Sequence, residues 1–271
     1  RESIKMITES VKKSAWDRVL ASRMNDRPIA SDYIDLLFDD FVEFHGDRYF
    51  KDDQAIIGGV ASFHGMPVTV IAQEKGHNTK ENLEHNFGMP SPDGYRKALR
   101  LMKQAEKFNR PVICFVDTAG ILWIGSRGAR SGRSNCKKSF EMSSLRTPIL
   151  SIVIGEGGSG GALALAVADE VWMMENAVYS ILSPEGYASI LWKDSKRAKE
   201  AAGAMKMTAK DLKEMGIVKK VFFEPEKYTT DTLPKITEKM DKEIVKFLAE
   251  KTKITKEQLV DERYNFFSNG Y

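Results

Sequence analysis

A glycine-rich run between two apolar segments is the sequence feature that most constrains the fold. Residues 154–164 read IGEGGSGGALA, in which five of the eleven residues are glycine. A strand-like apolar segment (148–154) precedes the run, and a helix-like apolar segment (162–168) follows it. Glycine has no Cβ, and the first turn of a helix leaves its N–H groups without intrahelical partners. The run therefore predicts a strand, turn and helix whose backbone can hold an anion or an oxygen that becomes negatively charged.

Other interpretations of this turn remain open beside a backbone oxyanion hole. A phosphate loop requires a lysine directly after the last glycines, where this chain has Ala162. Gly155, Gly157 and Gly160 fit a dinucleotide fingerprint, but they follow several earlier strand signals instead of opening the first strand–helix unit. Tight packing of a strand against a helix, with no ligand, also uses glycine.

Composition narrows the class of protein. The 271 residues are 42% hydrophobic and 29% charged, as expected of a soluble globular protein with one large domain or two small ones. A net charge of +3 is too small to indicate nucleic-acid binding. Cys114 and Cys136 form no C-x-x-C pair, which disfavours a zinc ribbon or a disulfide framework. No apolar run approaches the ~20 residues of a membrane span, and residues 1–23 do not resemble a signal peptide. We therefore expect no membrane association and a cytoplasmic location.

Strand and helix signals alternate along the chain, which predicts an α/β layered fold with parallel pairing. We expect helices over 9–22, 31–44, 91–108, 162–168, 185–192, 194–203, 209–216 and 233–253. We expect strands over 55–63, 67–74, 111–117, 148–155, 170–174, 178–182 and 218–223, the first two as a hairpin. Ser91 and Ser183 each precede a proline and are expected to cap the following helices.

Several further motifs carry a family resemblance. They are GDRYFKDDQAIIGG (46–59), NFGMP (86–90), RKALRLM (96–102), the glycine run and YSILSPEGYASILW (179–192). In this order, the motifs resemble those of the carboxyltransferase α subunits of bacterial acetyl-CoA carboxylase. The similarity extends from about residue 9 to about residue 250.

The resemblance implies a crotonase-type (ClpP/crotonase) fold of repeated ββα units with flanking N- and C-terminal helices. It divides the chain into an N-terminal helical extension (1–45), a carboxyltransferase domain (46–253) and a C-terminal tail (254–271). It also implies an α2β2 heterotetramer with a zinc-bearing β subunit, and no metal on this chain. The implied reaction moves CO2 from carboxybiotin, on a separate biotin carrier protein, to acetyl-CoA, and gives malonyl-CoA for fatty acid synthesis.

The same resemblance implies which residues form the site. Gly160 and Gly161 match the family's backbone oxyanion hole for the biotin ureido oxygen. Gly157, Gly158, Ser159 and Ala162 surround that hole, and we expect them to contact biotin. The segment Ser183, Pro184, Glu185 and Gly186 is expected to be a helix start first of all, and its family match also suggests a place near biotin.

Charged residues and histidines outside these motifs receive simpler interpretations. We expect the carboxylate of Glu156 to be satisfied by loop amides. Lys75, Lys80 and Lys97 are of a kind that attracts coenzyme A phosphates, but we expect them on a solvated face. The four histidines are expected at the surface or in turns: they are His45, His64, His77 and His85.

One stretch departs from the family pattern. After Asp117 and Thr118 the family has proline, glycine and an acidic loop, whereas residues 119–139 here are basic and contain no acid. The pattern resumes at Phe140, and codons can be chosen for 120–139 that encode an acidic loop in another frame. Two compensating frameshifts are therefore one hypothesis, which gene sequencing through this window tests. True divergence, or a basic loop that binds an acidic partner, are the alternatives.

Two other functions remain as alternatives, besides a related biotin-dependent decarboxylase, a class that usually has membrane partners. One is a single-chain acyl-CoA hydratase or isomerase of the same fold, which would need a glutamate acid/base pair beside the hole. The other is a subunit that assembles but is inactive because of its unusual loop.

Overall fold

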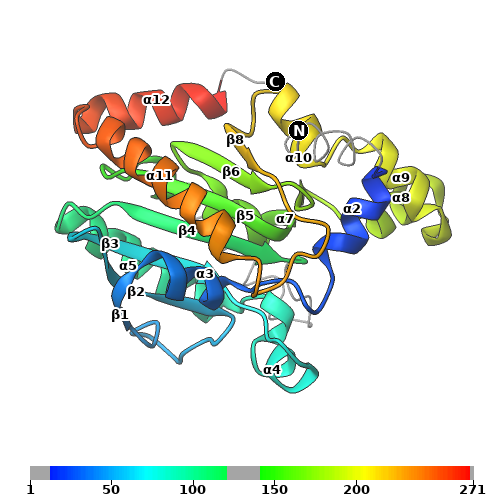
Figure 1. The fold of residues 1–271 in the computed structure, drawn as a ribbon, viewed down its shortest axis with the longest axis horizontal. Helices are drawn as coiled ribbons and strands as arrows, with labels where there is room; N and C mark the ends of the chain where they lie inside the picture. Colours follow the sequence, from blue (N-terminus) through cyan, green and yellow to red (C-terminus); the bar gives the residue numbers. More distant parts are fainter. Residues whose placement is uncertain (1–12, 121–140, 269–271) are drawn as a thin grey trace.

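The computed structural model describes residues 13–120 and 141–268 (Figure 1). The strands are β1 (Asp39–Glu43), β2 (Ile56–Phe63), β3 (Met66–Gln73), β4 (Val112–Thr118), β5 (Ile149–Gly158), β6 (Glu170–Met174), β7 (Val178–Ser180) and β8 (Lys220–Phe222). The helices are α2 (Ala15–Ser22), α3 (Ala30–Leu37), α4 (Thr79–Glu84), α5 (Pro92–Lys107), α7 (Ser159–Ala166), α8 (Pro184–Trp192), α9 (Ala198–Ala204), α10 (Ala209–Glu214), α11 (Pro234–Lys251) and α12 (Lys256–Ser268), with 3-10 turns η1 (Asn86–Gly88) and η2 (Ser195–Arg197).

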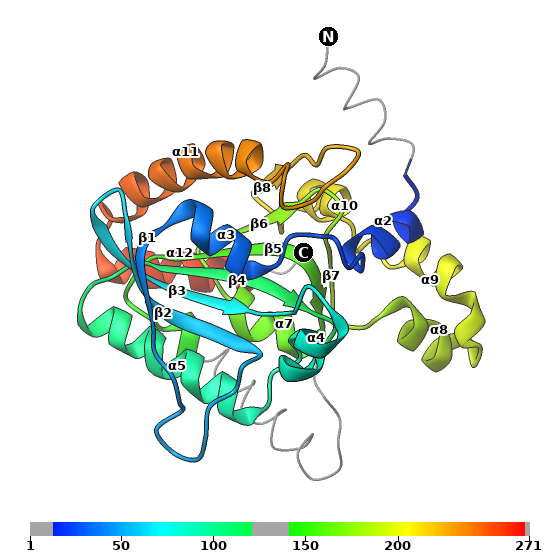
Figure 2. The same ribbon diagram turned by 60° about the horizontal axis from the view of Figure 1, so that its bottom comes forward.

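Within the described ranges, eight strands form one mixed sheet in the order β1-β2-β3-β4-β5-β6-β8, with β7 beside β5. The pairs β1–β2 and β2–β3 are antiparallel, and the remaining pairs are parallel. Figure 2 shows α3 and α11 on one face of the sheet and α5 and α7 on the other. Every residue of β4 is buried, as expected of a parallel strand covered on both faces.

The sheet forks at β5, and this fork positions the candidate site. Residues 150–153 of β5 pair with β6, whereas residues 156–158 pair with β7. The two neighbours therefore separate where β5 reaches its carboxyl end. Ligands of open α/β sheets bind outside the carboxyl ends of the strands.

The structure confirms most of the predicted elements, including the hairpin formed by β2 and β3. Helix α5 follows this hairpin, and it buries Leu101, Met102 and Ala105 at helical spacing. Burial of a large apolar side chain contributes about 1.5–3 kcal/mol. Ser91 occupies the N-cap position of α5, as predicted, but its side chain accepts no hydrogen bond from the first turn of the helix. The Ser91 N–H and hydroxyl both donate to Asp53 Oδ2 at 2.6 Å, which ties the start of α5 to the loop before β2.

The predicted helix over 31–44 is wrong in its second half. Helix α3 ends at Leu37, and residues 39–43 form the edge strand β1. Phe41 and Phe44 pack against the core from the extended chain, while Asp39 and Asp40 are exposed at the edge. Charged side chains on an edge strand discourage pairing with other chains. The three-residue spacing of the two phenylalanines favours a helix over a strand, which explains the error.

The C-terminal residues 256–268 form α12. Arg263 of this helix is fully buried, and its guanidinium bonds Asp169 as well as the carbonyl oxygens of Met142, Leu145 and Thr147. The segment is therefore anchored to the body through a side chain. The predicted domain boundaries at residues 45 and 253 stay a prediction.

Candidate active site at the carboxyl end of strand β5

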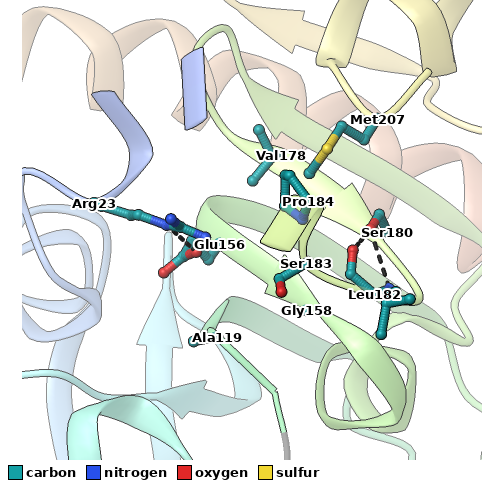
Figure 3. A pocket seen from close by; sticks show the side chains of 11 residues that line it. Arg23, Ala119, Glu156, Gly158, Val178, Ser180, Leu182, Ser183, Pro184 and Met207 are labelled. Atoms are coloured by element: carbon teal, nitrogen blue, oxygen red, sulfur yellow. Dashed lines mark hydrogen bonds and ion pairs between the residues drawn. The ribbon is translucent and has the colours of Figure 1, made fainter. Parts of the chain in front are cut away.

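An open pocket lies at the carboxyl end of β5, beside β7 (Figure 3). It is lined by residues from the end of β4, the end of β5, β7, the start of α8 and two further segments: Arg23, Ala119, Glu156, Gly157, Gly158, Val178, Ser180, Leu182, Ser183, Pro184 and Met207. Four predicted site residues thus meet in one pocket, although two of them precede the other two by about 25 positions in the sequence.

The glycine turn between β5 and α7 is sharp and closely packed. Ser159 has a φ of +58°, a left-handed conformation that is uncommon outside glycine and concentrates at functional sites. A Cβ on Gly158 would lie 2.4 Å from the carbonyl oxygen of Ala119, so only glycine fits between the ends of β4 and β5. The backbone at the turn is consequently held against the neighbouring strand.

Helix α7 follows the strand as predicted, but it begins at Ser159, three residues before the predicted start, so that Gly160 and Gly161 lie inside its first turn. The N–H groups at the start of a helix have no intrahelical acceptor and lie at the positive end of its dipole. A Cβ on Gly161 would lie 3.0 Å from the Gly120 carbonyl oxygen and 3.1 Å from the Tyr95 hydroxyl. The pocket lining includes Gly157 and Gly158 but not Gly160 or Gly161, which lie two and three residues beyond Gly158 in the first turn of α7.

The second predicted segment forms the opposite wall of the pocket. Ser183 caps α8, since its Oγ accepts a hydrogen bond from the Gly186 N–H at 3.1 Å, and Pro184 occupies the first turn. The capping prediction is confirmed. Ser183 and Pro184 line the pocket, whereas Glu185 and Gly186 are not among its lining residues.

Arg23 connects both walls, and the sequence analysis missed it. Its Nε donates to Glu156 Oε1 at 2.7 Å, and its Nη1 donates to Glu185 Oε1 at 2.7 Å. The hydrogen bond from Arg23 to Glu185 holds the pKa of Glu185 below its ordinary value. The prediction that loop amides satisfy Glu156 is wrong, because its carboxylate faces Arg23 and, at 3.7 Å, Lys75.

Lys75 and Asp117 form a buried ion pair beside the pocket. The Lys75 Nζ lies 2.6 Å from Asp117 Oδ1, and the same oxygen accepts the Glu156 N–H at 2.8 Å. The prediction of a solvated Lys75 is therefore wrong. A Cβ on Gly155 would lie 2.4 Å from Asp117 Oδ1, so this glycine makes room for the carboxylate.

The other two lysines differ from each other. Lys97 is fully buried, where its ammonium group contacts Glu43 at 3.2 Å and Asp52 at 3.0 Å, so the predicted solvated face is wrong for it. Lys80 is 87% exposed and confirms the prediction.

The histidines lie at the surface or in turns, as predicted, and contact acidic side chains or a carbonyl oxygen: His45 with Asp52, His64 with Asp241, His77 with Asp32, and His85 with the Gln54 carbonyl.

Glu74 is a buried carboxyl group near this cluster. It accepts hydrogen bonds from the Ser31 hydroxyl at 2.7 Å and the Ser31 N–H at 3.1 Å. Burial raises the pKa of Glu74 to about 8 in spite of these bonds.

Among the described residues, no group of three His, Cys, Asp or Glu side chains is placed to hold a metal ion. In the same part of the chain, no helix is both long and apolar enough to cross a membrane. Most of the atypical loop predicted at 119–139 lies outside the described residues.

Sequence comparisons identify close relatives. A family model described as acetyl co-enzyme A carboxylase carboxyltransferase-like matches residues 2–270. The chain is 58% identical over 254 residues to the acetyl-coenzyme A carboxylase carboxyl transferase subunit alpha of Clostridium acetobutylicum, covering 93% of this chain and 92% of that one. It is also 49% identical to a Clostridium tetani protein named as subunits beta/alpha, covering 97% of this chain and 46% of that one.

Solved structures share the fold. Transcarboxylase 12S superposes with a TM-score of 0.66 at 18% identity, covering 84% of this chain and 42% of that chain. The β subunit of geranyl-CoA carboxylase from P. aeruginosa gives a TM-score of 0.63 at 14% identity, covering 89% and 46%. The predicted crotonase-type fold class is confirmed.

Proposed function

The chain belongs to the family of acetyl-coenzyme A carboxylase carboxyltransferase alpha subunits, and we propose that it provides the biotin side of carboxyl transfer to acetyl-CoA. The product is malonyl-CoA, the carbon donor of fatty acid synthesis. The reaction takes place in the cytoplasm.

The observation that carries the proposal is the start of α7 beside the pocket. Carboxybiotin, bound as a substrate, supplies CO2 by breaking its N–C bond, which moves negative charge onto the ureido oxygen and leaves the ureido nitrogen to accept the α-proton of acetyl-CoA. The N–H groups of Gly160 and Gly161 stabilise that oxygen, because they belong to the first turn of α7. Gly157 and Gly158 shape one wall for the ring, and Ser183 and Pro184 shape the other.

The carboxylates near the pocket support this assignment over a hydratase or isomerase. Both Glu156 and Glu185 are bonded to Arg23, and Glu156 also faces Lys75. A general acid or base must be free to exchange a proton with the substrate. Among the described residues these glutamates serve as anchors, so the α-proton is left to the ureido nitrogen.

Partners follow from the family and from its fused members. Relatives in which the beta and alpha subunits share one name indicate that this chain works with a β subunit. We propose that the two associate as an α2β2 heterotetramer, in which the zinc-bearing β subunit supplies the acetyl-CoA site. A separate biotin carrier protein delivers carboxybiotin to the pocket.

The reverse reaction tests the proposal, with the purified chain, a cognate β subunit, malonyl-CoA and biocytin. We expect carboxyl transfer only when both chains are present. A mixed complex that assembles without turnover would indicate an inactive subunit. Turnover of an enoyl-CoA by the single chain would support the hydratase alternative and overturn carboxyl transfer.

A further inference from the structure

Arg23 is the residue that joins the two walls of the pocket. It follows α2, and Figure 3 shows its guanidinium directed at Glu156 on β5. Beyond the two 2.7 Å contacts, its Nη2 lies 3.3 Å from Glu185 Oε2, so Glu185 is held by both terminal nitrogens. Bidentate arginine–carboxylate pairs are stronger and more directional than single contacts.

The wall that carries Ser183 and Pro184 follows β7 in the chain, and its helix α8 also packs toward the sheet through α9 and α2. Helix α8 packs on α9 and η2, α9 packs on α2, and α2 contacts β5 and β7. Figure 1 shows α2, α8 and α9 gathered at one end of the molecule. The ion pairs of Arg23 therefore add a direct link from β5 to the first turn of α8, beside the chain connection through β7 and the packing through α2.

Arg23 also separates two cavities. It lines the site pocket and a second open pocket, whose other lining residues include Arg27, Lys75, Asn82 and Asp117. Its side chain is 32% exposed, so the guanidinium is shielded from solvent on several sides. Loss of this side chain would join the two spaces.

We propose that Arg23 is a positioning residue that fixes the width of the pocket by clamping Glu156 on one wall to Glu185 on the other. This inference rests on the proposed function, because the pocket is the place where biotin binds. Without the guanidinium, the two carboxylates lose their shared counter-charge and the α8 wall moves away from β5. Arg23 does not contact the reacting atoms.

The effect should be on biotin binding more than on chemistry. Arg23→Met keeps the length of the aliphatic chain but removes both ion pairs. We expect the KM for biocytin to rise roughly tenfold while the KM for malonyl-CoA is unchanged, which is the signature of lost ground-state binding at one site. Arg23→Lys retains the charge without the planar fork, so it should restore only part of the loss. Glu185→Gln, which leaves the Glu156 pair intact, should give a smaller rise.

Arg96→Met provides a matched control. Arg96 also bridges two acids, Asp47 and Asp93, and its side chain is 35% exposed, but it lines neither pocket. This variant should keep the biocytin KM of the unmodified chain. Thermal unfolding of every variant checks that each is folded.

The experiment measures both KM values in the reconstituted complex with the β subunit, together with hydrogen–deuterium exchange of the peptide 183–192. We expect faster exchange of this peptide in Arg23→Met and unchanged exchange in Arg96→Met. An active unmodified complex whose biocytin KM and exchange are insensitive to Arg23→Met would overturn the positioning role and leave the proposed function intact. An inactive unmodified complex would instead contradict the proposed function, and with it the biotin role of Arg23.

Discussion

The side-chain Nε2 of Gln73 donates a hydrogen bond of 2.8 Å to the carbonyl oxygen of Gly161, and Gln73 is fully buried. The bond connects the end of β3 to the first turn of α7, across 88 positions in the sequence. This hydrogen bond from a buried amide fixes the position of the first turn of α7 relative to the end of β3. Because Gly160 and Gly161 belong to that turn, the position of the proposed oxyanion hole depends on Gln73.

Substitution of Gln73 tests this dependence. Gln73→Leu removes the donor, and we expect kcat to fall roughly tenfold, which is less than the ~10²–10³ lost when a hole donor itself is removed. In Gln73→Glu, only the protonated acid can donate to the Gly161 carbonyl, and burial raises the pKa of such an acid. Activity should therefore be retained at low pH and lost as pH rises, measured against the unmodified complex. Equal kcat in Gln73→Leu and the unmodified chain would refute the link.

Glu74 makes stability depend on pH. A glutamate titrates near 4.5 in the unfolded chain, and the pKa of Glu74 in the folded protein is about 8. Between these values the folded state binds more protons, so this contribution is full below about pH 4.5 and is lost as pH rises through about 8. Relative to Glu74→Gln, the free energy of unfolding should fall by at most about 1.4 kcal/mol per pH unit in this window. Urea unfolding at about pH 5 and about pH 8 measures it, with the exposed Glu84→Gln as control.

Arg263 anchors α12, and its loss should be costly. Arg263→Met leaves Asp169 buried without its counter-charge, which typically costs about 3–5 kcal/mol. Arg146, whose side chain is 58% exposed, contacts Glu257 of the same helix at 3.8 Å. Arg146→Met should change stability by no more than about 0.5 kcal/mol. Urea unfolding compares the two variants, and similar midpoints would show that α12 is not anchored through Arg263.

Substitution by alanine should change the stability of the protein in opposite directions at two glycines, Gly155 and Gly203. A Cβ on Gly155 would meet the Asp117 carboxylate at 2.4 Å, so Gly155→Ala should destabilise the protein by about 1–3 kcal/mol and disturb the Lys75–Asp117 pair. Gly203 lies in α9 with nothing within 4 Å of the added Cβ, and Gly203→Ala should stabilise by about 0.5–1 kcal/mol. Thermal unfolding of the two variants tests both predictions. Shifts of the unfolding temperature in the same direction would contradict the close packing described around Gly155.

Local patterns in the sequence were sufficient for most of the fold. The β2–β3 hairpin, the apolar strands β4 and β5, and the capped helix α8 follow from alternation, apolar runs and turn chemistry. The edge strand β1 does not, because the three-residue spacing of Phe41 and Phe44 is typical of a helix and does not show the alternation of a strand. Its conformation depends on pairing with β2, which is a tertiary contact.

The ion pairs around the site could not be predicted, because they join residues that are far apart in the sequence. Arg23 meets Glu156 and Glu185 at separations of 133 and 162 positions. Lys97 was interpreted as solvated because a lysine is ordinarily exposed. Its burial is stabilised by Glu43 and Asp52, which the fold brings to it from the loop and strand before β2.

The measurement that tests the central claim most directly is the kcat of Gly161→Val in the reconstituted complex. The new Cβ would lie 3.0 Å from the Gly120 carbonyl oxygen, and the added methyl groups must displace the backbone of the first turn of α7. If the N–H groups of this turn stabilise the ureido oxygen, carboxyl transfer to or from biocytin should fall by about 10²–10³ while association with the β subunit is unchanged. Turnover at the unmodified rate in a folded, assembled Gly161→Val complex would contradict the backbone oxyanion hole.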